Sequence, residues 1–155
     1  MKGTHEYVDD PRNETILIDI NGSHFPRHEA KISVFDSGFV LGDGVWEGLR
    51  LHSGNIAFLN QHLDRLLEGA KALDLDIGIT RQALTARLYA LITANGMSDG
   101  VHIRLMVTRG LKATPYQDPR VTISAATIVI IPEYKQAMPE TAQTGISLFT
   151  VHVRR

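Results

Sequence analysis

Arginine and histidine side chains recur in this sequence at positions where an anion could be held. Arg65 lies between Leu63 and Leu66, two apolar positions of an expected helix, while His102 and Arg104 are two residues apart in an expected strand. Alternate residues of a strand share one face of the sheet, so His102 and Arg104 lie together. Such a pair is a poor neighbour in a hydrophobic core, and we expect this face to border solvent or to receive an anion. Arg65 either extends along the helix edge or binds an anion with its planar guanidinium.

A glycine-rich bend precedes another candidate. Gly42-Asp43-Gly44 leads directly into the segment that carries Trp46. Glycine adopts positive φ without steric cost and lets a neighbouring backbone approach closely, so these residues predict a sharp change of chain direction. Trp46 just beyond the bend either forms a flat pocket wall or fills the core.

Other chemistries have no support in the sequence. No cysteine is present, which excludes disulfides, thiolate metal ligands and a cysteine nucleophile. No set of His, Asp and Glu has the spacing of a metal site, and no metal is expected. Neither of the common glycine-rich phosphate motifs, Walker A or G-x-G-x-x-G, occurs.

The composition is that of an ordinary globular domain. The 155 residues are 43% hydrophobic and 21% charged, and the formal net charge is -1. This charge predicts no binding to nucleic acid or to an anionic membrane. The first residues include no apolar signal segment, and no run approaches the roughly 20 apolar residues of a membrane helix. Together with the lack of cysteine, this favours a soluble, cytoplasmic protein.

These residues need a scaffold, and the apolar pattern predicts strands, then two helices, then strands again. Expected strands cover residues 15–20, a return after Asn21-Gly22, 31–36, 45–52, 56–59, 101–108, 122–131 and 146–153. The two helices are expected to begin after Asn60 and Thr80, whose side chains can cap them. This order is typical of an α+β domain, with two helices packed on a mostly antiparallel sheet. The long loop over residues 110–120 is a candidate ligand contact.

Four segments, taken in order and with their spacing, resemble a known family. They are GDGVWEGLR at 42–50, Phe58-Leu59 followed by HLDRL at 62–66, HIR at 102–104 and VTRG at 107–110. They resemble the N-terminal half of fold-type IV pyridoxal-phosphate enzymes, which include branched-chain and D-amino-acid aminotransferases and aminodeoxychorismate lyase. The resemblance covers nearly the whole chain. It implies a homodimeric transaminase that uses pyridoxal 5'-phosphate to transfer an amino group from an amino acid to a 2-oxo acid.

The resemblance also implies roles for individual residues. Arg65 matches the arginine that binds the cofactor phosphate. Trp46 occupies the aromatic position beside the substrate, and Arg104 matches a substrate-side arginine that could contact a carboxylate. Leu41 and His102 stand where substrate-side tyrosines are expected. Arg109, in the recurring Thr-Arg-Gly motif, is expected to support the site rather than to contact the substrate.

The same resemblance places the lysine that forms an aldimine with the cofactor beyond Arg155, so no catalytic residue is expected in this chain. None of its lysines is expected in that role: Lys2, Lys31, Lys71, Lys112 and Lys135. We expect residues 1–155 to form the N-terminal domain, with about residues 140–155 beginning the connection to a C-terminal domain that carries the lysine. The piece alone is expected to be inactive.

Several functions stay open. Trp46-Glu47-Gly48-Leu49-Arg50 is close to the branched-chain enzymes, which favours an apolar, branched-chain-like L-amino acid. The loop at 111–116 lacks the Arg-x-His arrangement shared by D-amino-acid aminotransferases. An (R)-selective amine transaminase and an aminodeoxychorismate lyase, which releases pyruvate, are alternatives within the cofactor class. A non-catalytic lobe that binds a phosphorylated small molecule or a partner chain is an alternative outside it.

Overall fold

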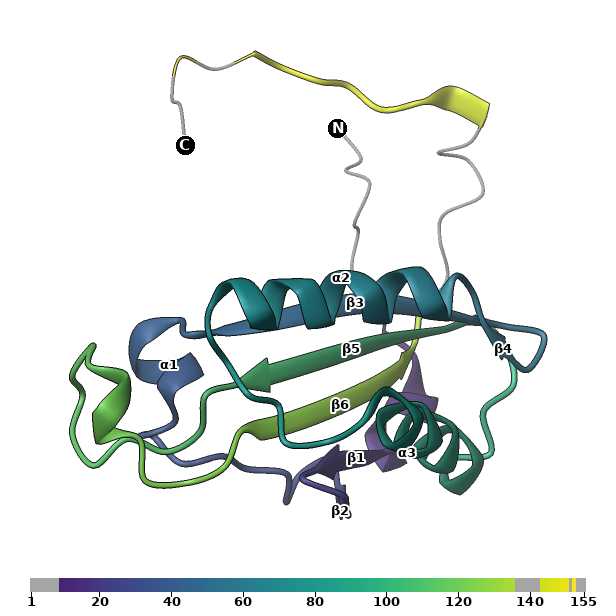
Figure 1. The fold of residues 1–155 in the computed structure, drawn as a ribbon. Helices are drawn as coiled ribbons and strands as arrows, with labels where there is room; N and C mark the ends of the chain where they lie inside the picture. The colour runs from purple at the N-terminus through teal and green to yellow at the C-terminus, as the bar shows by residue number, and fades with distance from the viewer. Residues whose placement is uncertain (1–8, 136–142, 151, 153–155) are drawn as a thin grey trace.

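One antiparallel sheet organises the structure, a computed structural model that describes residues 9–135, 143–150 and 152. Within these residues the sheet has six strands in the order β2-β1-β6-β5-β3-β4, and every neighbouring pair is antiparallel (Figure 1). The strands are β1 (Leu17–Ile20), β2 (Ser23–Pro26), β3 (Gly44–His52), β4 (Asn55–Ile56), β5 (Val101–Thr108) and β6 (Thr127–Tyr134). The long central pairs β3–β5 and β5–β6 align eight residues each.

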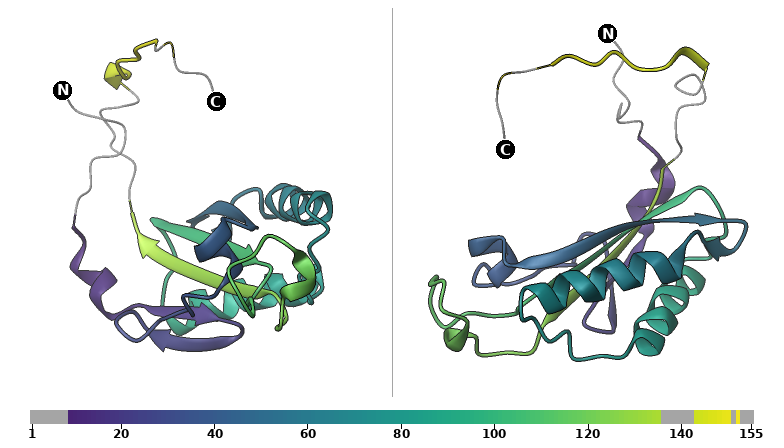
Figure 2. Two further views of the ribbon diagram at one scale, coloured as in Figure 1. Left: turned by 90° about the vertical axis from the view of Figure 1, so that its left-hand side faces the viewer. Right: turned by 45° about the horizontal axis from the view of Figure 1, so that its top comes forward.

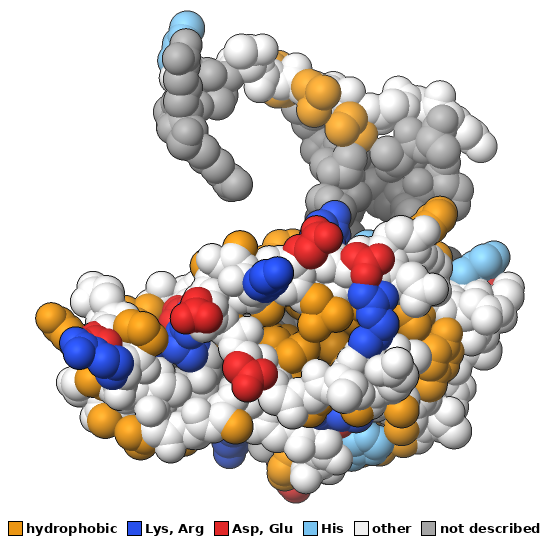
Figure 3. Space-filling view, in the orientation of Figure 1, with side chains coloured by type: hydrophobic (Ala, Val, Ile, Leu, Met, Phe, Trp, Pro, Cys, Tyr) orange, Lys and Arg blue, Asp and Glu red, His pale blue; other side chains and the backbone are white. Residues whose placement is uncertain are grey.

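Two long helices cover one face of this sheet (Figure 1 and Figure 2). They are α2 (Leu59–Ala72) and α3 (Arg81–Ala94), and shorter turns of helix are α1 (Ser37–Leu41), η1 (Pro11–Thr15) and η2 (Pro119–Val121). Thr80 caps α3 as predicted, because its side chain accepts a hydrogen bond from the Ala83 amide. The outer side of α2 is charged with both signs (Figure 3). No helix in the described ranges is long and apolar enough to span a bilayer.

The core lies between the helices and one face of the central strands. Leu63 and Leu66 of α2 pack with Leu49 of β3 and with Ile103 and Leu105 of β5, and all five are almost fully buried. Successive residues of a strand point to opposite faces, so the residues between them lie on the other face. We call this the open face and define it by Trp46, Gly48 and Arg50 of β3 and His102, Arg104 and Met106 of β5.

The bend at Gly42-Asp43-Gly44 has a steric explanation. Gly42 ends α1 with φ of 68°, in the left-handed region that glycine adopts most easily. Gly44 opens β3 so close to β5 that a Cβ atom there would lie 2.5 Å from the Val107 carbonyl oxygen. The first glycine is therefore needed for its conformation and the second for the space it leaves. Together they set the direction of β3.

Two local expectations were wrong because tertiary contacts took precedence over local pattern. Residues 31–36 form no strand. The Asp36 side chain instead accepts a hydrogen bond from the Gly38 amide, which caps α1, and another from the Thr108 hydroxyl. Helix α2 begins at Leu59, earlier than the expected start after Asn60, and Phe58 precedes it with a φ of 51° and no side-chain cap.

The remaining differences concern strand lengths. The strand expected at 56–59 is reduced to the two-residue β4, and the one expected at 122–131 is β6, shifted to Thr127–Tyr134. Residues 122 and 123 pair instead with the loop, where the Ile123 amide donates to the Leu111 carbonyl. Residues 146–150 are described and form no strand, while 151 and 153 of that expected strand lie outside the described residues.

Candidate functional site

Three of the predicted substrate-side residues lie on the open face. The guanidinium carbon of Arg104 is 4.3 Å from the centre of the Trp46 ring, a cation–π contact between neighbouring strands. His102 lies two residues before Arg104, and Arg50 of β3 lies directly opposite His102. The Trp46 side chain remains 61% exposed. The open face therefore combines a flat aromatic surface with several cationic groups.

Leu41, the fourth predicted substrate-side residue, lies elsewhere. It is the last residue of α1 and is half-buried. The bend at Gly42 separates it from β3, so it lies beyond the end of the strand that carries Trp46. The structure therefore brings Trp46, His102 and Arg104 together and leaves Leu41 at the end of their face.

Burial and neighbouring cations affect the charge of His102. Burial is the main cause that lowers its pKa below the ordinary value of 6.5, and the charges of Arg50, Arg104 and Lys135 act in the same direction. Glu133, which faces His102 from β6, acts against them. His102 is therefore neutral at pH 7, where its ring offers both a donor and an acceptor.

This environment predicts an acid-sensitive contribution to stability from His102. Below pH 6.5 the unfolded chain binds a proton at this residue before the folded chain does, so the free energy of unfolding falls as pH falls through that value. Urea unfolding at about pH 7 and about pH 5.5 measures this drop in the free energy of unfolding. The drop should be smaller in the His102→Gln variant than in the parent. An NMR titration of the His102 ring should give a midpoint below 6.5. A midpoint above that value would contradict the prediction.

Arg65 meets a buried carboxylate on the opposite side of β3. Glu47 follows Trp46 in the strand, points toward α2 and is 2% exposed. Arg65 Nε lies 2.6 Å from Glu47 Oε1, and Arg65 Nη2 lies 2.5 Å from Glu47 Oε2. His62, one helical turn earlier, places its Nδ1 2.8 Å from the same Oε2. Glu47 thus holds both side chains of this turn of α2.

The electrostatics of this cluster keep Glu47 ionised. Hydrogen bonds from Arg65 are the main cause that lowers the pKa of the Glu47 carboxyl, with a further contribution from His62, and they outweigh the opposing effect of burial. The Arg65 side chain is 72% exposed, and its Nη1 has no hydrogen-bond partner among the described residues. The guanidinium is therefore held from below by two bonds while its outer edge can bind an anion from solvent.

Glu47 is the site residue that sequence reasoning missed. Its signal was present in strand alternation, because Glu47 shares a face with Leu49 and Leu51, and both leucines are buried. A carboxylate on such a face needs a partner, since an unpaired buried charge is very costly. Helix α2 packs on β3 and brings the partners of Glu47, which are Arg65 and His62.

Arg109, which follows β5 directly, is held by an acidic side chain and by backbone carbonyls. Its Nε lies 2.7 Å from Asp43 Oδ2, while Nη1 and Nη2 each lie 2.8 Å from a backbone carbonyl, of Asp74 and Leu73 respectively. These two carbonyls directly follow the last turn of α2. Through Arg109 they are connected to Asp43 in the bend at Gly42-Asp43-Gly44. Arg109 therefore joins the end of β5, the bend and the helix that carries Arg65.

The loop at residues 110–120 contains a buried lysine. Lys112 is 2% exposed, and its Nζ donates to the Asp118 carbonyl at 3.0 Å. The bond closes the loop on itself and leaves Tyr116 exposed at its tip. In the described ranges, no three or more His, Cys, Asp or Glu side chains gather as metal ligands would.

Comparison with known proteins identifies the family of this chain. The model of the family described as amino-transferase class IV matches residues 44–155. Branched-chain-amino-acid aminotransferase-like protein 1 of Arabidopsis thaliana is 39% identical over 145 residues, which are 94% of this chain and 26% of that protein. The chain thus spans about a quarter of the length of this relative.

Solved structures match the fold as well. The 4-amino-4-deoxychorismate lyase of Pseudomonas aeruginosa superposes with a TM-score of 0.64 and 31% identity, over 81% of this chain and 42% of that one. The T.th. branched-chain amino acid aminotransferase with pyridoxamine 5'-phosphate gives a TM-score of 0.69 and 26% identity, over 81% of this chain and 41% of that one. The shared motifs, the match over residues 44–155 and the shared sheet lead to one conclusion: this chain belongs to the class IV aminotransferase family.

Proposed function

We propose that the protein containing this chain is a transaminase that uses pyridoxal 5'-phosphate to transfer an amino group from an amino acid to a 2-oxo acid. The observation that carries the proposal is Arg65, whose guanidinium is anchored by the buried Glu47 and open on its outer edge. A fixed, permanently charged fork is the preferred protein group for a phosphate. Family membership and the neighbour that holds pyridoxamine 5'-phosphate support the same cofactor.

The residues present fit the cofactor phosphate. Arg65 would bind it, and Glu47 and His62 would orient Arg65 without touching the cofactor. When bound, pyridoxal phosphate supplies an electron-withdrawing ring that stabilises charge developing at the substrate Cα. The chain's own contribution is to bind the phosphate and to position the substrate beside that ring.

The open face supplies the substrate contacts of the proposal. Trp46 would form an apolar wall that excludes water from the reacting carbon, and Arg104, already stacked on Trp46, would bind a substrate carboxylate. Neutral His102 would complete this side of the pocket, and the apolar Leu41 would border it from beyond the bend at Gly42. An apolar, branched-chain-like substrate agrees with Trp46 and Leu41 and with the name of the Arabidopsis relative.

The remainder of the protein belongs to the same proposal. We assign the catalytic lysine to none of the residues of this chain and place it in a C-terminal domain, with about residues 140–155 as the start of the connection.

The proposal includes a homodimer, because three apolar side chains that a second subunit could cover are each more than 60% exposed: Val34, Phe39 and Ile123. Their segments are held together by the Asp36–Leu111 bridge and the bond from Ile123 to Leu111. A cytoplasmic location is proposed on the absence of cysteine.

An amino-transfer assay with the complete gene product tests the proposal. With pyridoxal phosphate bound, L-leucine or L-valine and 2-oxoglutarate should yield glutamate and the matching oxo acid. Including D-alanine and an (R)-amine as donors separates the stereochemical alternatives. A protein that binds pyridoxal phosphate but transfers no amino group from any of these donors would overturn the assignment.

Aminodeoxychorismate lyase chemistry is the second candidate. It is favoured by the 31% identity to the Pseudomonas aeruginosa lyase. The same protein supplied with 4-amino-4-deoxychorismate would then release pyruvate without needing an amino acceptor. Pyruvate release in the absence of any 2-oxo acid would select the lyase over the transaminase.

A further inference from the structure

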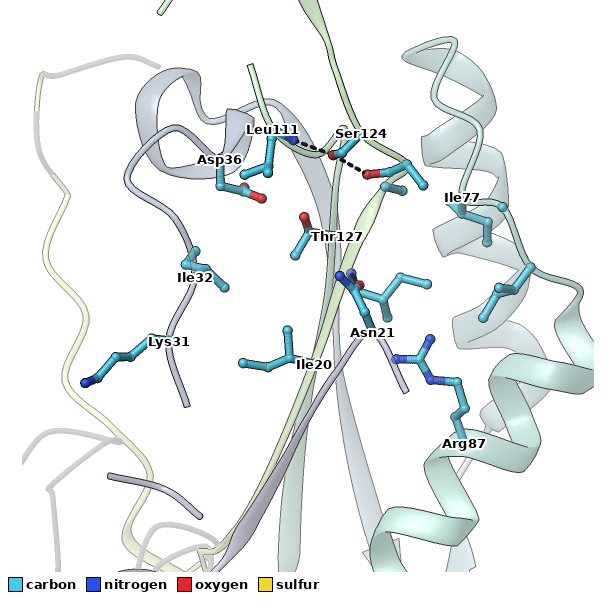
Figure 4. A pocket seen from close by; sticks show the side chains of 15 residues that line it. Ile20, Asn21, Lys31, Ile32, Asp36, Ile77, Arg87, Leu111, Ser124 and Thr127 are labelled. Atoms are coloured by element: carbon cyan, nitrogen blue, oxygen red, sulfur yellow. Dashed lines mark hydrogen bonds between the residues drawn. The ribbon is translucent and has the colours of Figure 1, made fainter. Parts of the chain in front are cut away.

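A cavity of 460 Å³ lies away from the proposed cofactor and substrate residues (Figure 4). It is open to solvent and is bordered by the end of β1, the segment at 31–36, the turn at 77–79 before α3, and the start of β6. Trp46, Arg65, His102 and Arg104 do not line it. A ligand in this cavity would therefore occupy a second site on the domain.

The walls of the cavity are mostly apolar. Ile20 and Ile32 contribute from one side and Ile77 from the other (Figure 4), and Ile79 also lines the cavity. Ile32 is 46% exposed at the rim. A concave apolar surface with a few polar groups is the usual form of a small-molecule site.

One cationic side chain projects into this cavity with unused hydrogen-bonding capacity. Arg87 of α3 donates through Nη2 to the buried carboxylate of Asp19, and its Nη1 makes no hydrogen bond among the described residues, whereas its Nε, also unpaired there, has no surface that a ligand could reach. In Figure 4 the guanidinium points toward Asn21. The Asn21 side-chain oxygen already accepts from the Ile128 amide at 2.8 Å, which leaves its NH₂ group as a second donor beside Arg87. The donors that a ligand could reach are therefore Arg87 Nη1 and the Asn21 NH₂ group, and an anionic acceptor is favoured between them.

We propose that this cavity binds a small monocarboxylate with an apolar body. The carboxylate would accept hydrogen bonds from Arg87 and Asn21, and the apolar body would pack on the four isoleucines. A dianion such as phosphate fits less well, because Asp19 already offsets the charge of Arg87, and the carboxylate Asp36 offsets the charge of Lys31, which also lines the cavity. The proposal does not depend on the transaminase assignment.

Hexanoate is the probe for this site, with hexanol as the neutral control of equal chain length. In ¹H–¹⁵N NMR titrations of the chain, hexanoate should shift the amides of Ile20 and Asn21 and the Arg87 Nε–H in a saturable way. Hexanol should bind at least about tenfold more weakly, because it leaves the charge-assisted bonds unmade. Equal affinities, or hexanoate shifts centred on Trp46 and Arg104, would overturn the proposal, and so would stronger binding of inorganic phosphate.

Matched variants locate the ligand. Ile32→Asp places a negative charge on the rim and should weaken hexanoate binding about fivefold or more. Ile146→Asp makes the same change at a side chain that is 49% exposed and does not line the cavity, and it should leave the affinity unchanged. Arg87→Lys keeps a cation for Asp19 but removes the planar guanidinium that can bond Asp19 and a ligand at the same time, and it should weaken binding about tenfold. Equal affinity in Ile32→Asp and Ile146→Asp would contradict the placement.

Discussion

Replacing Arg65 by alanine is expected to weaken the binding of pyridoxamine 5'-phosphate by about ten- to a hundredfold. Charge-assisted hydrogen bonds of this kind contribute about 1.5–3 kcal/mol, and about 1.4 kcal/mol corresponds to a factor of ten. The dissociation constant can be measured by calorimetry or ³¹P NMR, because the amine form of the cofactor does not react with lysines. Arg12→Ala is the matched control: it removes the same charge from an arginine paired with Asp10 on η1.

Glu47→Gln separates the role of position from that of charge. The amide keeps the shape of the carboxylate but loses one acceptor and the negative charge that holds Arg65 and His62. Arg65 then keeps its charge and loses its fixed orientation, so we expect a smaller loss of affinity, about three- to tenfold. A positioning role predicts that this variant binds with intermediate affinity while its circular dichroism spectrum stays that of the parent.

If Arg65→Ala bound the ligand as tightly as Arg12→Ala, the phosphate role of Arg65 would be wrong.

Arg109→Met is expected to lower the free energy of unfolding by about 2–4 kcal/mol. The side chain is 17% exposed, and its loss would leave Asp43 without its ion pair and the carbonyls of Leu73 and Asp74 without their donors. Removing one partner of a largely buried, hydrogen-bonded pair produces losses of this size. Urea unfolding measures the change.

Two controls make this result specific. Arg120→Met breaks an exposed pair with Asp118, in which the arginine is 89% exposed, and should change stability by at most about 0.5 kcal/mol. Arg109→Lys keeps the charge but cannot span Asp43 and both carbonyls at once, so it should lie between the parent and Arg109→Met. If Arg109→Met were no less stable than Arg120→Met, the connection between the bend and α2 would not matter for stability.

Local pattern predicted the scaffold where a single element carries its own signal. The alternation of Val101 to Thr108 and the capping Thr80 need only the neighbouring residues, and both appear as expected. The shared face of His102 and Arg104 follows from strand geometry alone. The strand predicted at 31–36 does not form, although the segment has strand-like alternation. Asp36 instead accepts a hydrogen bond from the distant Thr108 hydroxyl and caps α1, which begins at the next residue.

The sequence by itself determined the element order, the family resemblance, and the identity of the side chains that could hold a phosphate or a carboxylate. The tertiary structure alone decided which of these side chains are anchored and where they point. Arg65 is fixed by Glu47, 18 residues earlier in the chain, and Arg87 meets Asp19 across 68 residues. The physical reason is that a buried charge must find its partner wherever packing brings one, and packing joins residues whose separation in sequence carries no local pattern.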